Sequence, residues 1–462
     1  MKMKNKKVQK LFLVIALVTA LGVVTPMLSG CFGAPAAAPP EAPPAAAPPA
    51  AAKTVNVAMV TALSGPAAMW GLPGITGVGI LLDDVNAAGG LRVGDERYLV
   101  NLVTYDDENI ATKAAMGAKK VILEDDAKII AALCDPPASA MAPYSTKYKV
   151  FLFPLCAPAR PDRPYVLVGV DHCMRTDTMR GYWLAQNHPE IESVAIINND
   201  DIMGKQGEAY TVAGWKSAGV DLSYVGRFSL DTTDFAPVMS AVLATNPDAI
   251  DTSVTYPEFV ILLVEQAYLQ GFDGIFAHLD SDLAATTARV PLDWLAGRYH
   301  ESFAEMSDAV WGDPSPQHDF YRKWAAIYGP GAPQDEFRAM ISVDWLYQNA
   351  VEVWMAGVEA AGTFDADEVM AALKAMDEIP TMTGPHIWTD EIGLEVLGIA
   401  NWIEPPFFIT TPLLTPDPDA IGGDRKVLDT FRFSDWYSEH GDILLEELES
   451  RELMWWQEME AE

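Results

Sequence analysis

Residues 57–90 read VAMVTALSGPAAMWGLPGITGVGILLDDVNAAGG. The apolar run Val57–Leu63 predicts a strand, and a Ser-Gly-Pro turn follows it at Ser64–Pro66. The next segment is long and mostly apolar, which predicts a helix over Ala67–Ala88. A strand that passes through a short turn into a helix is typical of an α/β domain whose ligand lies at the carboxyl end of the first strand.

The same alternation of strand and helix patterns continues along the chain. The first set of strands is predicted at Val55–Leu63, Tyr98–Tyr105, Ile129–Leu133, Val150–Phe153 and Val166–Val170, with helices at Ile110–Asp125 and Ser139–Tyr148 between them. A second set has strands at Val194–Asn198, Leu222–Phe228, Ala249–Val254 and Gly274–His278, and helices at Gly204–Ala218, Phe235–Thr245 and Pro257–Gln270. Repeated β-α units with short connections predict a doubly wound parallel sheet in each set, and therefore two α/β lobes.

The opening stretch resembles that of the type I periplasmic solute-binding proteins of the leucine/isoleucine/valine-binding family. The shared features are the Ser-Gly-Pro turn, the aromatic-glycine pair Trp70-Gly71 and the D-x-N-A-x-G-G ending at Asp84–Gly90. The resemblance extends, with gaps, from about Val55 to about Leu414. It implies two doubly wound parallel-sheet lobes joined by a three-crossover hinge, which close around a small solute and deliver it to an ABC importer whose permease is a separate chain.

The resemblance also implies a division of the chain. Lobe 1 is expected at 54–175 plus 307–380 and lobe 2 at 176–306 plus 381–415, with long helices at Gln317–Tyr328, Glu336–Gly357 and Ala366–Met376 returning to lobe 1. The hinge crossovers are expected near Arg175, Glu301–Val310 and Pro380–Pro385. An acidic C-terminal extension, 416–462, lies beyond the resemblance. Its segment Ile443–Gln457 has helical periodicity and either packs on the body as an extra helix or docks with a partner.

Residues 1–30 resemble a bacterial lipoprotein signal peptide. Five lysines precede the apolar run Leu11–Val24, and Leu28-Ser-Gly-Cys31 follows it. The apolar run is short for a membrane span. The resemblance implies that Cys31 is lipidated, and residues 31–53, which are rich in Ala and Pro, predict an extended tether. We therefore expect an extracytoplasmic protein, in the periplasm or on the outer face of the cell membrane, that is anchored to the membrane by lipid.

The composition excludes several function classes. The formal net charge is −33, and the first 30 residues add only positive charge, so the remainder is even more acidic and is unsuited to nucleic acid. No H-E-x-x-H, G-x-S-x-G, C-x-x-C or Walker A sequence occurs, and the seven histidines have no metal-ligand spacing. The pairs Asp106-Asp107 and Asp200-Asp201 are interpreted as caps and solvated loops. We expect no catalytic residues, no metal, no cofactor, no nucleic-acid partner and a monomer.

The candidate ligand residues follow the strands, because ligands of open α/β sheets bind outside the carboxyl ends. Together with the family comparison, this predicts eight of them: Ser64, Trp70, Asp135, Cys156, Ala157, Met203, Tyr256 and Asp280. Trp70 either contacts the apolar part of the ligand or packs in the core under its helix. Met203 stands where the family often has an aromatic residue, and Tyr256 belongs to a Tyr-Pro-Glu that the family shares. Asp280, with Asp282 as its competitor, either pairs with a ligand ammonium or caps the next helix.

Two positions depart from the family pattern. The family binds a ligand carboxylate through hydroxyl residues after two strands, where this chain has Cys134-Asp135 and Leu155-Cys156-Ala157. An ionised Asp135 either repels a carboxylate or caps its own helix and fills the anion site from within, and in both cases the family's usual carboxylate pocket is not expected. Cys134 and Cys156 either form a disulfide or are buried thiols. The departures predict a small polar or amine-bearing solute, such as an amine, an amide or an amino acid bound differently. A ligand-sensing subunit for a membrane receptor is the alternative function.

Overall fold

The structure is a computed structural model of the 462-residue chain. It describes residues 53–65, 67–134, 136–156, 163–168, 172–279, 283–302, 316–328, 343–398, 401–412 and 425–454. All of them belong to one compact unit, Ala52–Glu462. Within these ranges, no helix combines the length and the apolar character that a membrane crossing needs. The expected signal peptide, Cys31 and the tether lie outside the described residues.

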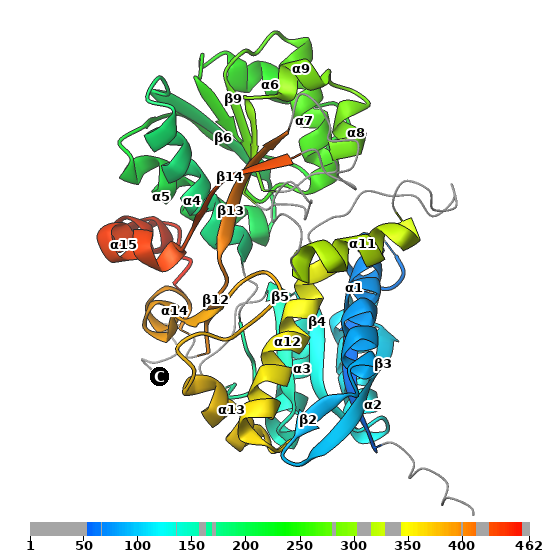
Figure 1. The fold of residues 1–462 in the computed structure, drawn as a ribbon. Coiled ribbons are helices and arrows are strands. Elements are labelled where there is room, and N and C mark those ends of the chain that lie inside the picture. The colour runs from blue at the N-terminus through cyan, green and yellow to red at the C-terminus, as the bar shows by residue number, and fades with distance from the viewer. Residues whose placement is uncertain are drawn as a thin grey trace, which may run out of the picture. The chain divides into compact units, whose positions relative to one another are not determined.

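The first sheet has five strands in the order β2-β3-β1-β4-β5 (Figure 1). Its central strand β1 pairs in parallel with β3 and β4, β4 pairs in parallel with β5, and β2 is an antiparallel edge. The bounds are β1 Lys53–Thr61, β2 Leu91–Val93, β3 Glu96–Asp106, β4 Ala127–Cys134 and β5 Phe151–Cys156.

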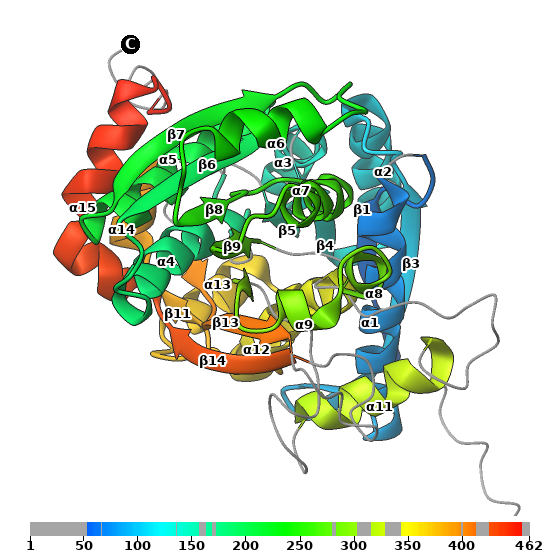
Figure 2. The same ribbon diagram turned by 90° about the horizontal axis from the view of Figure 1, so that it is seen from above.

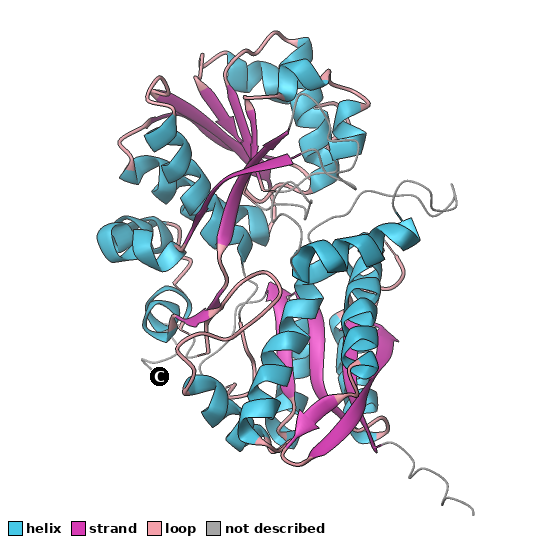
Figure 3. Ribbon diagram, in the orientation of Figure 1, coloured by secondary structure: helices cyan, strands magenta, loops and turns pink. Residues whose placement is uncertain are grey.

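Helices cover both faces of this sheet (Figure 3). Alternate residues of β1 enter two different cores: Val57 and Met59 join the core with α1, α11, α12 and α13, whereas Ala58 and Val60 join the core with α2 and α3. We call this sheet and these helices the first lobe. The helix bounds are α1 Ala68–Ala87, α2 Ala111–Leu123, α3 Pro137–Tyr148, α11 Pro316–Tyr328, α12 Val343–Ala361 and α13 Ala366–Lys374.

The second sheet has seven strands in the order β14-β13-β10-β9-β8-β6-β7 (Figure 1). The strands from β10 to β7 are parallel, and β13 and β14 add an antiparallel edge. The bounds are β6 Ser193–Asn199, β7 Asp221–Phe228, β8 Ala249–Asp251, β9 Ile275–His278, β10 Tyr299–Glu301, β13 Phe407–Pro412 and β14 Arg425–Phe431.

The second sheet is also covered on both faces, and together with its helices it is the second lobe. Val194 and Ile196 of β6 pack with residues of α4 and α5, and Ala195 and Ile197 pack with residues of α6 and α7. The helix bounds are α4 His172–Asn187, α5 Ile202–Ser217, α6 Ala236–Leu243, α7 Pro257–Leu269, α8 Leu283–Thr287 and α9 Leu292–Leu295. The predicted α/β fold with two doubly wound lobes is confirmed.

The glycines of the opening motif allow α1 to approach its neighbours closely. A Cβ on Gly71 would lie 1.9 Å from the carbonyl oxygen of Ala62, and one on Gly77 would lie 1.5 Å from that of Asp344 on α12. Asn86, near the end of the helix, exchanges two hydrogen bonds with the backbone of Val100 on β3, at 2.8 and 2.9 Å. The motif therefore fixes how α1 sits between β1, β3 and α12.

The chain passes between the lobes three times: between β5 and α4, between β10 and α11, and between α13 and β13. The first and third crossovers lie side by side, because Val168 bridges Trp402 in parallel. The buried guanidinium of Arg175 lies 4.4 Å from the ring centre of Trp402 and donates to the carbonyl oxygen of Ile403 at 3.1 Å. Arg175, which was predicted to lie near a crossover, thus connects the first crossover with the third.

The C-terminal extension is part of the body as far as it is described. Strand β14 pairs with β13, and α15 (Phe433–Ser450) packs on α4 and α5, as the view in Figure 2 shows. Trp436 is buried in this contact and donates its indole N–H to Ser217 Oγ at 3.0 Å. This confirms the packed-helix interpretation for residues up to 450, although the helix begins ten residues before the predicted start. Trp455 and Trp456 lie outside the described residues.

Several predicted elements differ from the structure. Residues 166–168 form isolated bridges rather than the predicted strand at Val166–Val170, because this segment is already the first crossover. The part of the chain expected to return to lobe 2, 381–415, contains a helix that was not predicted, α14 (Asp390–Leu397), between the short strands β11 (Ile387–Trp388) and β12 (Ile403–Glu404). Helix α4 was missed, because its many polar residues hide the apolar periodicity.

Candidate functional site

The centre of the candidate site is a hydrogen bond between Tyr256 and Asp201 in the second lobe. Tyr256 precedes α7 after β8, and Asp201 precedes α5 after β6. The Tyr256 hydroxyl donates to Asp201 Oδ2 at 2.7 Å, while Asp201 Oδ1 accepts from Gly204 N at 2.8 Å and from Asn199 Nδ2 at 2.6 Å. Asp201 therefore caps α5, as the sequence suggested for this carboxylate, and it also orients Tyr256.

Burial raises the pKa of Tyr256 well above its ordinary value, and the bond to Asp201 raises it further. The phenol thus keeps its proton, which is committed to Asp201. The remaining lone pair of the hydroxyl oxygen can only accept a hydrogen bond. The site consequently offers an acceptor to a ligand at this point.

Two observations indicate that the strand ends of the lobes lie near each other here. Cys134, at the end of β4 in the first lobe, is close enough to Tyr256 to add to the rise of its pKa electrostatically. Leu279, directly after β9 in the second lobe, packs against the core of the first lobe. The residues beside Tyr256 and after β9 therefore face the first lobe, as a cleft between the sheets requires.

In the first lobe, Ser64 lies in the loop after β1, where its hydroxyl donates to Asp106 Oδ2 at 2.5 Å. Asp106, the last residue of β3, also accepts from the backbone N–H groups of Leu63 and Glu108. Slight burial alone would raise the pKa of Asp106, but these hydrogen bonds outweigh it and hold the pKa below its usual value. Asp106 thus organises the loop that carries Ser64, a role that the sequence pattern did not single out.

Trp70 and Met203 are both half-buried. Trp70, in the first turn of α1, packs against the core of the first lobe, so part of its surface lies in the core as one of the two predictions required. Met203, in the first turn of α5, packs against a core that includes residues of α5 and α15. Both side chains keep some exposed surface at the start of a helix that follows a strand. Their contact with a ligand stays a prediction.

Asp135, Ala157 and Asp280 lie outside the described residues, and of Cys156 only the backbone is described. In the register of β4 and β5, Cys156 is directly opposite Cys134. The Sγ atom of Cys134 lies 3.9 Å from Oδ1 of Asn109. The roles predicted for Asp135, Cys156, Ala157 and Asp280 therefore stay predictions.

Two polar residues near the strand ends lie in the interior. Asp107 was interpreted as part of a solvated loop, but it is 1% exposed and its Oδ1 accepts from Asn109 N. Burial, with some help from the charge of Asp106, raises its pKa to about 6. His278 is fully buried beside Tyr299 and lies 3.5 Å from Glu301. Among the side chains that are described, no group of three or more His, Cys, Asp or Glu could hold a metal ion.

The structure has two α/β lobes joined by three crossovers, and residues predicted to contact a ligand follow strands whose ends face the other lobe. This arrangement is typical of a solute-binding protein of the periplasmic type. The sequence profile of the family described as "Periplasmic binding protein" matches residues 54–394. The chain belongs to this family.

Individual relatives agree with this assignment. The Leu/Ile/Val-binding protein of Citrobacter freundii is 26% identical over 361 residues, which cover 76% of this chain and 91% of the relative. Among solved structures, an ABC transporter substrate-binding protein from Sphaerobacter thermophilus has a TM-score of 0.66 at 15% identity, with 82% of this chain and 98% of the other covered. A solute-binding protein of an ABC transporter from Rhodopseudomonas palustris, in complex with 3,4-dihydroxybenzoic acid, has a TM-score of 0.63 at 18% identity and covers 82% and 97%.

These comparisons confirm the resemblance to the leucine/isoleucine/valine-binding family and the type I fold. They also confirm that the chain is an extracytoplasmic substrate-binding protein rather than an enzyme, since its relatives are binding proteins of transporters. The relatives whose ligands are named span aliphatic amino acids and an aromatic acid, so the fold alone does not select the solute.

Proposed function

We propose that this protein is a lipid-anchored, extracytoplasmic solute-binding protein that captures a small amine-bearing or strongly hydrogen-bonding solute. The solute would bind between the two lobes, 54–175 plus 307–380 and 176–306 plus 381–415, and be delivered as a monomeric complex to an ABC permease. The ligand residues would be Ser64, Trp70, Asp135, Cys156, Ala157, Met203, Tyr256 and Asp280, with Cys31 as the lipidated residue.

One observation supports the choice of solute: the Tyr256 hydroxyl donates its hydrogen bond to Asp201, so it cannot also donate one to a ligand. A group that can only accept favours an ammonium, an amide N–H or a hydroxyl as its partner, and it offers nothing to a carboxylate. Asp280 and Asp135, if they face the cleft, would strengthen the same preference. Ser64, whose proton is directed to Asp106, presents an acceptor in the same way.

A thermal-shift screen followed by calorimetric titration tests this proposal. The purified protein would be screened with amines, amides, leucine, isoleucine, valine and aromatic acids, because a ligand of the folded state raises the melting temperature. We expect shifts with amines or amides and none with leucine. Tyr256→Phe removes the acceptor and should weaken the binding of the best ligand about tenfold, or about 1.4 kcal/mol.

The matched control is Tyr268→Phe, because Tyr268 is a half-buried tyrosine near the other end of the same helix α7. It should leave affinity unchanged. Tight binding of leucine, isoleucine or valine that Tyr256→Phe does not weaken would contradict the proposal and return the protein to the ordinary branched-chain class.

A further inference from the structure

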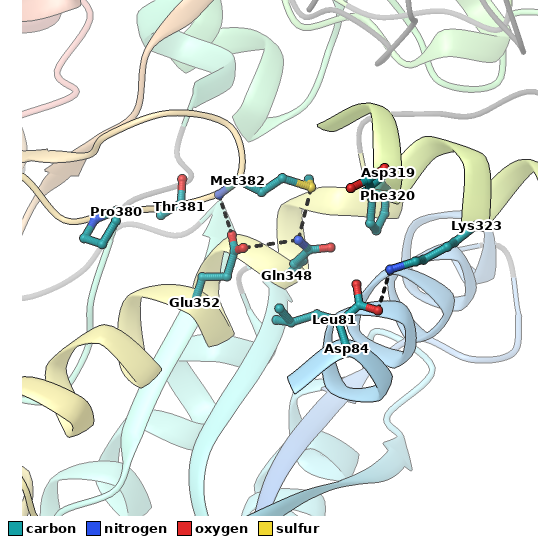
Figure 4. Close-up of a pocket in the computed structure, with 10 residues that line it drawn as sticks. All are labelled: Leu81, Asp84, Asp319, Phe320, Lys323, Gln348, Glu352, Pro380, Thr381 and Met382. Atoms are coloured by element: carbon teal, nitrogen blue, oxygen red, sulfur yellow. Dashed lines mark hydrogen bonds and ion pairs between the residues drawn. The ribbon is translucent and has the colours of Figure 1, made fainter. Parts of the chain in front are cut away.

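A second pocket of about 660 Å³ lies outside the predicted cleft, between α1, α11, α12 and the third crossover. None of the predicted ligand residues whose side chains the structure describes lines it. Its polar lining comes chiefly from Asp84, Asp319, Lys323, Gln348 and Glu352, as Figure 4 shows. Leu81, Phe320 and Met382 supply apolar surface. The pocket thus combines charged groups with an apolar wall.

One wall of this pocket is the hinge itself. Glu352 of α12 accepts a hydrogen bond from the backbone N–H of Met382 at 3.0 Å. The Gln348 amide group donates to Glu352 Oε1 at 3.3 Å and to the Met382 sulfur at 3.2 Å. One residue along α12, Asn349 donates to Thr383 Oγ1 at 2.9 Å. Helix α12 therefore holds the third crossover in place as the roof of the pocket.

The charges around the pocket favour a cation. Among the described residues of the lining, three carboxylates, Asp84, Asp319 and Glu352, face one ammonium group, that of Lys323. Lys323 is already paired with Asp84 across α1 and α11. The two remaining carboxylates, on α11 and α12, lack such a partner among the described contacts of the pocket lining, so the net charge that a ligand meets is negative.

Besides the acidic lining, the side chain of Gln348 independently indicates a ligand site. Gln348 is 3% exposed, and its Oε1 has no hydrogen-bond partner among the residues that the structure describes. Figure 4 shows this oxygen pointing away from Glu352, toward the space that Phe320, Lys323 and Leu81 border. A buried amide oxygen without a donor is unfavourable by about 1–3 kcal/mol, and an incoming N–H group would remove that cost.

We propose that this hinge pocket binds a small organic cation, namely a primary ammonium group on a short apolar body. The ammonium group lies between Glu352, Asp319 and the Gln348 amide oxygen, and the alkyl chain lies against Phe320 and Met382. The site is separate from the cleft and does not depend on the identity of the transported solute.

The pH dependence of binding follows from Glu352. Burial raises the pKa of Glu352 to about 7, although the bonds from Met382 N and Gln348 oppose the rise. The charged groups that face it across the pocket are Asp84 of α1 and Asp319 and Lys323 of α11. An ammonium group prefers the ionised carboxylate, so affinity should rise as the pH rises through about 7. Between pH 6 and pH 8 the ionised fraction grows about tenfold, and affinity should grow with it.

The probe for this site is n-butylammonium chloride, titrated at constant ionic strength into protein that carries ¹³C-methyl methionine. The Met382 methyl signal, assigned through Met382→Leu, reports occupancy of the pocket wall. We expect this signal to shift saturably as the probe is added at pH 8. At pH 6 we expect the same titration to give an affinity about ten times weaker. Glu352→Gln keeps an acceptor for Met382 N but loses the charge, and it should weaken binding at pH 8 about tenfold and abolish the pH dependence.

The matched control is Glu359→Gln, an exposed carboxylate on the same helix, which should bind the probe as the unchanged protein does. Tyr256→Phe should also have no effect on this signal, so failure of the hinge site and failure of the cleft proposal are separable. The inference is overturned if the Met382 methyl does not move, or if Glu352→Gln binds the probe as tightly as Glu359→Gln at pH 8.

Discussion

In the first lobe, α1 is held against α12 by close apolar packing, whereas in the second lobe α4 is held to the sheet by buried charges. Gly77 of α1 lies against the backbone of Asp344, with no room for a side chain between them. In the second lobe, Arg180 of α4 donates to Asp251 Oδ1 at 2.6 Å and lies 2.7 Å from Asp177 Oδ1. All three of these charged side chains are fully buried.

The difference teaches how each side of the cleft is positioned. Close packing fixes the distance between two helices, but a hydrogen-bonded ion network also fixes orientation, because each bond is directional. Arg180 also donates to Ser302 Oγ at 2.6 Å, at the start of the second crossover. The network therefore joins α4, which follows the first crossover, to β8 and to the second crossover. In the second lobe, charge therefore ties the end of β8 to the hinge.

The largest expected effect is the loss of Arg180. Arg180→Met leaves Asp177 and Asp251 buried without their shared cation, which should lower the free energy of unfolding by about 3–5 kcal/mol. Burial, with the charge of Asp251, already raises the pKa of Asp177 to about 7 in spite of Arg180. Urea denaturation followed by circular dichroism measures the loss.

The control for this variant is Arg289→Met, in the same lobe. Arg289 pairs with Glu265 at 2.8 Å, but its side chain is 46% exposed, so its loss should change stability by less than about 1 kcal/mol. If Arg180→Met costs no more than Arg289→Met, the buried network does not hold the second lobe, and the contrast between the lobes fails.

Much of the fold could be predicted because its signals are local. The apolar strands and the glycine-rich α1 are visible in the sequence, and they were placed to within a few residues. Helix α4 was missed because its buried face carries Arg175, Asp177 and Arg180, which sequence patterns assign to the surface. Charges that are satisfied by distant partners, such as Asp251, can be recognised as interior only after the chain is folded.

The next effect in size tests the packing of the first lobe. Gly77→Ala would place a Cβ 1.5 Å from the carbonyl oxygen of Asp344, so α1 must move away from α12, at a cost of about 2–3 kcal/mol. Gly79→Ala is the control on the same helix, because a Cβ there meets no atom within 4 Å. It should be neutral or stabilising by up to about 1 kcal/mol. Equal effects of the two variants in urea denaturation would show that close approach does not limit the first lobe.

The candidate site was only partly visible in the sequence, for a similar reason. Tyr256 could be found because it follows a strand in a Tyr-Pro-Glu motif. Its orientation depends on Asp201, which is 55 residues away and was interpreted only as a cap. Asp106 organises the Ser64 loop across two strands, and Gln348 and Glu352 belong to a helix pattern that looks purely structural. Partners that meet only through tertiary contact leave no local signal.

The smallest expected effect is on the pH dependence of stability, and its sign differs between the two lobes. His300 of β10 in the second lobe is 2% exposed, and burial lowers its pKa to about 3, with smaller contributions from His188 and Arg180. In the unfolded chain the pKa is about 6.5, so the unfolded state binds the proton more readily below that pH. Stability is therefore expected to fall as the pH drops from about 6.5, by about 1–2 kcal/mol at pH 5 from this group.

His300→Leu removes the titrating group and should flatten this part of the pH profile, measured by urea denaturation at pH 5, 6 and 7.5. Glu352, on the first lobe, has the opposite sign: its pKa is raised to about 7, so the folded state binds the proton more readily and stability falls as the pH rises from about 4.5 to about 7. Glu352→Gln should therefore gain most above pH 7, where His300→Leu gains least. If both variants change the profile in the same direction, the two buried groups do not titrate as their surroundings require.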